Sequence, residues 1–132
     1  MKRFTQALGT SVALALLAVP AAYAGAKSSF NVVVNTSIRY AEGAQGTARN
    51  SADAVQRIYC RTNADSAGNE SVRCYAVNSA NVTATCFSTL PAHVRSAQSA
   101  GDASFIYFTW DASGICRSLD VLKGSHLEPK AP

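Results

Sequence analysis

The sequence predicts a mainly β fold: an antiparallel meander that forms a small β-sandwich or barrel, with one short helix and two disulfides. Three observations predict it: short apolar runs separated by turn-forming residues, an even number of cysteines, and one helical pattern bounded by a proline and a glycine. The chain has 132 residues, of which 48% are apolar and 15% charged. This length suits one small domain, and the composition excludes a disordered or coiled-coil chain.

The first 24 residues have the composition of a secretory signal peptide. Lys2 and Arg3 give a short cationic start, Ala7 to Val19 is an apolar run, and Ala22-Tyr23-Ala24 matches an Ala-x-Ala cleavage site. The apolar run is shorter than the roughly 20 residues that span a bilayer, although a retained membrane anchor is the alternative. We therefore expect residues 1–24 to be removed and residues 25–132 to form a single disulfide-bonded β domain without a membrane span. The pattern is typical of bacterial export, so we expect a secreted or periplasmic protein.

Alternation of apolar and polar residues opens the remaining chain. From Ser28 to Tyr40, residues such as Phe30, Val32 and Val34 fall on one parity, which predicts a half-buried strand. Residues 41–52 contain glycines and other small side chains, a composition typical of a long loop. Such a loop is either mobile or a binding loop.

Five further strands and one helix are predicted in the rest of the chain. Residues 64–69, 78–81 and 111–114 are rich in turn-forming types, which indicates tight hairpins. Between Thr89 and Gly101, Pro91 suits a first helical position and Gly101 suits the C-terminal cap. The predicted strands are Val55–Thr62, Ser71–Val77, Val82–Thr89, Ser104–Trp110 and Ile115–Leu122. The run Ser104–Trp110 is apolar on both parities, which predicts a central strand covered on both sides and so a second layer. Trp110 is expected in the core.

The four cysteines predict two disulfides, because none belongs to a Cys-x-x-Cys pair of the kind that binds zinc. If each hairpin is symmetric about its turn, Cys60 lies opposite Cys74, and Cys74 lies opposite Cys86. Since Cys74 can bond to one neighbour only, we favour Cys60 with Cys74 and Cys86 with Cys116. The other two pairings remain open.

The same register predicts a surface that carries arginines and aromatic rings. The side of the sheet opposite the cysteines would hold the candidate ligand-binding residues Arg57, Tyr59, Arg61, Arg73, Tyr75 and Phe87. Arginine guanidinium groups hold carboxylate, sulfate or phosphate, and aromatic rings stack on planar groups or sugars. The alternatives are that arginine stems merely cover the aromatic rings, or that the register is shifted by one residue.

Signals for catalysis, metal binding and nucleic-acid binding are weak. Neither His93 nor His126 has a carboxylate or cysteine at ligand spacing, and we expect no metal and no cofactor. An acidic pair assembled from Asp102, Asp111 and Asp120 is the remaining route to an enzyme, of the glycosidase type. Because two of the 12 Lys and Arg residues precede residue 25 and all eight acidic residues follow it, residues 25–132 carry a net charge of +2. This charge is too mild for a nucleic-acid binder.

The sequence thus favours an exported, non-catalytic binding domain that contacts anionic or glycan ligands through the Arg and Tyr residues of one sheet face. The expected partners are an anionic polysaccharide or an extracellular protein, and no nucleic acid. The alternative is a secreted inhibitor of an extracellular hydrolase that inserts a rigid element into the enzyme's cleft. That element would be the loop 41–52 or the turn 64–69.

Overall fold

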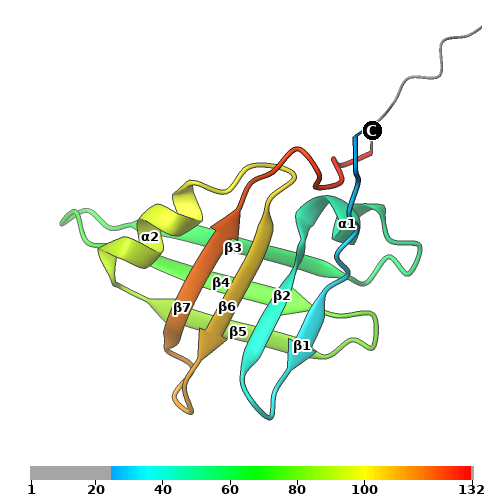
Figure 1. Ribbon diagram of the computed structural model, residues 1–132. Coiled ribbons are helices and arrows are strands. Elements are labelled where there is room, and N and C mark those ends of the chain that lie inside the picture. The colour runs from blue at the N-terminus through cyan, green and yellow to red at the C-terminus, as the bar shows by residue number, and fades with distance from the viewer. Residues whose placement is uncertain (1–24, 132) are drawn as a thin grey trace, which may run out of the picture.

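Two antiparallel β-sheets form the protein, in a computed structural model that describes residues 25–131 (Figure 1). The elements are β1 (Val33–Asn35), β2 (Tyr40–Ala44), α1 (Gln45–Asn50), β3 (Arg57–Ala64), β4 (Glu70–Val77), β5 (Thr83–Ser88), α2 (Pro91–Gln98), β6 (Phe105–Trp110) and β7 (Cys116–Leu122). One sheet has the strand order β1-β2-β6-β7 and the other β3-β4-β5. Their strands cross at a steep angle, with one sheet behind the other (Figure 1). The predicted mainly β fold is confirmed, and it is a two-sheet sandwich. The predicted signal peptide lies outside the described residues.

Alternate residues of both sheets fill the space between them. Ile106 and Phe108 of β6 and Val72 and Cys74 of β4 are at most 1% exposed. The predicted helix is confirmed as α2, which begins at Pro91 and packs against β3, β4 and β7. It covers one end of the sandwich, to the left in Figure 1. The core therefore depends on pairing both sheets with the apolar side of this helix.

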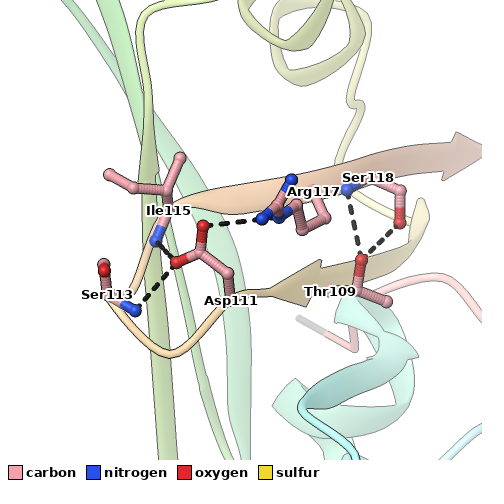
Figure 2. Close-up of polar contacts among 6 residues, drawn as sticks. All are labelled: Thr109, Asp111, Ser113, Ile115, Arg117 and Ser118. Carbon is pink, nitrogen blue, oxygen red and sulfur yellow. Dashed lines mark hydrogen bonds and ion pairs between the residues drawn. The ribbon is translucent and has the colours of Figure 1, made fainter.

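Three hairpin turns share one geometry, so the strands leave each turn in a symmetric register, although the β6–β7 register then shifts at a bulge between Thr109 and Trp110. In each turn the first side chain accepts hydrogen bonds from the backbone N–H groups two and four residues later. The residue three positions later has a positive φ, at Gly68 (83°), Asn81 (61°) and Gly114 (78°). The first residues of the turns are Asp65, Asn78 and Asp111. Figure 2 shows the Asp111 turn between β6 and β7.

The strand registers and the disulfide pairing agree with the sequence prediction. Cys60 lies opposite Cys74, and Cys74 lies opposite Cys86. The disulfides are Cys60–Cys74 and Cys86–Cys116. The second disulfide joins β5 to β7 and so ties the two sheets together. Two disulfides indicate an oxidising environment, extracellular or periplasmic.

The predicted single strand from Ser28 to Tyr40 is wrong, because the chain reverses direction after β1. The Asn35 side chain accepts hydrogen bonds from the N–H groups of Ser37 and Ile38, and Arg39 has a φ of 56°. These features form a turn that lets β1 pair antiparallel with β2. Alternation in the sequence continues through the turn, so periodicity alone could not locate it.

Residues 41–52 are not a loop, which corrects the second expectation for this region. They form the end of β2 and the helix α1, which adds a second helix to the one predicted. The two glycines of residues 41–52 lie where chain segments approach closely, since a Cβ on Gly43 would lie 2.9 Å from the Cα of Val32. A Cβ on Gly46 would overlap the carbonyl oxygen of Glu128 in the C-terminal segment. Close packing, and not flexibility, explains the glycines here. The segment is therefore not the long loop that the inhibitor hypothesis expected at this position.

Two predictions, the meander and the central strand covered on both sides, are each confirmed in part. Strands β3, β4 and β5 follow in order, but β2 pairs with β6, so the other sheet joins distant parts of the chain. One side of β6 is buried in the core as predicted. On its other side Phe105 and Tyr107 are half-buried by neighbouring rings, with centroids 5.2 Å from Phe30 and 6.0 Å from Tyr40. The predicted second layer is the β3-β4-β5 sheet, which covers the buried side of β6 only. Trp110 packs against the core, as expected.

Candidate functional site

The candidate surface is the side of the β3-β4-β5 sheet that faces away from the other sheet. Alternation places Ile58, Cys74 and Cys86 in the core and the intervening side chains on the outer side. We call the following set the Arg/Tyr face: Arg57, Tyr59 and Arg61 on β3, Arg73 and Tyr75 on β4, and Phe87 on β5. The structure thus places all six candidate residues on one surface.

Aromatic rings on this face form two contacts with arginines. Tyr59 and Tyr75 lie directly opposite each other, with ring centroids 5.5 Å apart and planes tilted by 40°. The guanidinium carbon of Arg57 lies 5.6 Å from the centroid of the Tyr75 ring, and that of Arg73 lies 5.6 Å from the centroid of Phe87. Such cation–π contacts hold the arginine stems against the sheet. The rings therefore position the cationic groups and remain partly open, with Tyr59 45% exposed.

The positive charge of the Arg/Tyr face is not compensated by acidic groups of the described chain. Arg61 lies directly opposite Arg73 in the register, an arrangement that destabilises a sheet. Within residues 25–131, none of the three arginines of the face forms an ion pair or a side-chain hydrogen bond. The outward-facing positions of β3, β4 and β5 contain no Asp or Glu. The three arginines of the face therefore have no acidic partner within residues 25–131.

Two hollows lie at the Arg61 and Arg73 end of the face. The first, of about 330 Å³, is lined by Arg61, Arg73 and Phe87 together with Asn63 and Ser71. The second, of about 340 Å³, is lined by Arg73 and Phe87 and by the β6–β7 turn, including Ile115. The register could have identified Asn63 and Ser71, since they share the parity of the arginines. Ile115 reaches the site because the Cys86–Cys116 disulfide ties β7 to β5, and the predicted pairing of these cysteines was the one sequence signal for it.

Asp111, one of the three carboxylates considered for an acidic pair, serves the fold of its own turn. It accepts hydrogen bonds from the N–H groups of Ile115 and Ser113 and forms a 3.3 Å ion pair with Arg117 (Figure 2). The Ile115 N–H is the main cause that lowers the pKa of Asp111, with further contributions from Ser113 and Arg117. A carboxyl group that acts as a general acid needs a raised pKa instead.

The other two carboxylates are too far from Asp111 for a glycosidase pair. Asp102 and Asp111 lie beyond opposite ends of the six-residue strand β6, a span of about 20 Å. Asp120 lies opposite Tyr107, four residues from Asp111, or about 13 Å along the strand. Glycosidase carboxyl groups lie at most about 9.5 Å apart. Asp102 forms an ion pair with Lys130 at 3.3 Å.

A serine and a histidine meet at the start of α2, a contact that sequence reasoning missed. The Nδ1 atom of His93 lies 2.9 Å from the Oγ atom of Ser88, which also accepts a hydrogen bond from the N–H of Leu90. Ser88 is only 2% exposed, and no carboxylate of the described chain hydrogen-bonds to His93. The pair therefore stabilises the turn into the helix. In residues 25–131, no three His, Cys, Asp or Glu side chains come together as a metal site.

Comparisons with family models, with curated proteins and with solved structures found no match. No helix in the part of the chain that the structure describes is long and apolar enough to cross a membrane. The fold and the face together define a disulfide-bonded β-sandwich with one cationic, aromatic sheet surface.

Proposed function

We propose that the protein is an exported, non-catalytic domain that binds acidic glycans through the Arg/Tyr face. The supporting observation is the set of three arginines that lie among aromatic rings without an acidic partner in the described chain. Proteins seldom place two arginines directly opposite each other unless something neutralises them. An anionic ligand between Arg61 and Arg73 would remove that repulsion.

The chemistry of the face favours carboxylate or sulfate groups on a ring-containing ligand. A guanidinium group donates two parallel hydrogen bonds to such an anion. Tyr59 and Tyr75 offer ring faces and hydroxyl groups beside the cations, suited to the apolar and polar edges of a sugar. The charge attracts the ligand and the rings orient it, so that binding requires no group with a perturbed pKa and no metal.

Retention on a heparin resin tests the proposal. The variant Arg61→Gln/Arg73→Gln keeps part of each arginine stem but removes both charges, and we expect it to elute at a clearly lower salt concentration than the unmodified protein. The control Arg95→Gln/Lys123→Gln removes two exposed charges outside the face, from α2 and from the segment after β7. It should elute close to the unmodified protein. Equal losses in both variants would mean that only net charge matters, and the proposal would then be wrong.

A second candidate function is inhibition of an extracellular hydrolase by insertion of the β3–β4 turn. The supporting observation is that residues 61–70 are all exposed, in a hairpin that projects beyond α2 (Figure 1). The Asp65 side chain makes this turn rigid through hydrogen bonds to Ala67 and Asn69, and a rigid element loses little entropy on insertion.

A matched pair of variants tests the inhibitor hypothesis. Ala67→Trp enlarges the β3–β4 turn, and Ala80→Trp makes the same change at the equivalent position of the β4–β5 turn. We expect inhibition of a hydrolase to be lost in the first variant only. A panel of extracellular hydrolases that the unmodified protein does not inhibit at micromolar concentration would refute the hypothesis.

A further inference from the structure

A larger hollow, of about 410 Å³, lies at the other end of the Arg/Tyr face, beside the edge strand β3. Its walls come from α1, from the segment between α1 and β3, from the first residues of β3, and from the C-terminal segment. Arg57 and Tyr59 line this hollow and also belong to the Arg/Tyr face. The hollow is therefore continuous with the surface proposed to bind glycans.

Cationic groups from three parts of the chain surround this hollow. Arg49 lies in the last turn of α1, Arg57 begins β3, and Lys130 belongs to the C-terminal segment. No acidic side chain lines the hollow. Arg49 has no ion pair among residues 25–131, while Lys130 pairs with Asp102, a residue whose side chain is 94% exposed. An exposed pair of this kind is weak, so an incoming anion can compete for Lys130.

Asp53 is the one acidic residue in the segment between α1 and β3, and its carboxylate accepts hydrogen bonds from that segment. Asp53 accepts hydrogen bonds from the N–H groups of Val55 and Gln56 and from the Gln56 side chain. These bonds, that of the Gln56 N–H first, lower the pKa of Asp53 to about 2. Its carboxylate is therefore ionised and folds the segment, and it forms no ion pair with a cation of the hollow. Gln45 also lines the hollow; its backbone N–H donates to the Ser104 carbonyl, but its side-chain amide forms no hydrogen bond within residues 25–131, so it is available to a hydroxyl group.

The spacing of the two cationic ends indicates the kind of ligand. Arg57 and Arg61 are four residues apart on one strand, or about 13 Å. Tyr59 lies between them on the same side. A single small anion cannot reach both ends, whereas an extended chain with repeated acidic groups can, with its rings over Tyr59.

We infer that the hollow around Arg49, Arg57 and Lys130 is a second acidic-group subsite, and that the ligand is an acidic oligosaccharide long enough to span both ends of the Arg/Tyr face. This inference rests on the proposed function and adds a length requirement to it. An oligosaccharide fits better than a nucleic acid because residues 25–132 carry a net charge of only +2, since two of the 12 basic residues precede residue 25.

Binding of heparin-derived oligosaccharides of two lengths, a disaccharide and an octasaccharide, tests the inference by titration calorimetry. We expect the unmodified protein to bind the octasaccharide more tightly. Arg49→Gln should weaken octasaccharide binding by about tenfold and leave disaccharide binding unchanged, because a charged hydrogen bond is lost at the far end only. The control is Arg95→Gln, which removes the equivalent arginine from the last turn of α2 and should change neither affinity.

The outcomes separate this inference from the proposed function. If Arg61→Gln/Arg73→Gln abolishes binding but Arg49→Gln does not weaken octasaccharide binding, the second subsite is refuted and the proposed function stands. If the unmodified protein binds neither oligosaccharide, both fail. If a single-stranded oligonucleotide binds more tightly than the octasaccharide at equal ionic strength, the ligand class is wrong. Thermal unfolding of each variant, followed by circular dichroism, checks that the fold is retained.

Discussion

Replacing Arg61 by glutamine should make the protein more stable while it weakens ligand binding. Arg61 lies directly opposite Arg73 on the neighbouring strand, and the described chain supplies no acidic group between them. The folded protein therefore bears a repulsion that the unfolded chain, in which the two residues are far apart, does not. Removing one charge removes the repulsion. A residue that lowers stability and improves binding is expected at a functional site.

The size of this effect follows from the register. Directly opposed Cβ atoms lie about 5 Å apart, so two guanidinium groups in water at about 6 Å would repel each other by about 0.7 kcal/mol. This is an upper bound, because the Arg73 guanidinium lies over the Phe87 ring on β5, on the side away from Arg61. At an ionic strength of 0.15 M the Debye length of about 8 Å reduces this to roughly 0.3 kcal/mol. Arg61→Gln should therefore raise the free energy of unfolding by up to about 0.7 kcal/mol at low salt. For a domain of this size, that corresponds to a rise in Tm of about 3–5 °C.

Urea denaturation and calorimetric melting at two salt concentrations measure the effect. The control is Arg57→Gln, because Arg57 lies opposite Val77 and has no cation directly across the strand pair, while Arg49 and Lys130 lie only across the hollow, so this variant should show no net gain of stability. It loses the contact with the Tyr75 ring and should be slightly less stable. A gain for Arg61→Gln that does not shrink with added salt, or a loss of stability, would refute the electrostatic reasoning.

Three further predictions concern the stability of the fold. Replacing Cys86 and Cys116 by alanine opens a link over 30 residues and should lower the free energy of unfolding by about 3–4 kcal/mol, measured by urea denaturation under non-reducing conditions. Gly46→Ala places a Cβ against the carbonyl oxygen of Glu128, so faster hydrogen exchange in the C-terminal segment is expected, and unchanged exchange would contradict the close contact. Because the pKa of Asp53 is lowered from 3.8 to about 2, chiefly by the Gln56 N–H, its contribution is present above pH 4 and is lost as the pH falls toward 2. Asp53→Asn should therefore lower Tm at pH 7 and flatten the decline of Tm between pH 4 and pH 2.

The sequence determined those features that depend on neighbours in the chain. Asp65, Asn78 and Asp111 each begin a turn whose third following residue accepts a positive φ, so the strands leave each turn in a symmetric register. This register placed Cys60 opposite Cys74 and put the six residues of the Arg/Tyr face on one side. Local turn chemistry and a period of two residues are sufficient for such a prediction.

Only the tertiary structure decided the pairing of β2 with β6, the helix α1 and the second cationic hollow. Gly46 and Glu128, and likewise Arg49 and Lys130, are about 80 positions apart in the sequence, yet they meet where the C-terminal segment crosses α1. The free energy that favours such contacts comes from burying surfaces of distant segments against each other, and it leaves no periodic pattern in either segment. The composition of residues 41–52 therefore resembled that of a loop, although Gly43 and Gly46 lie where close packing leaves no room for a Cβ atom.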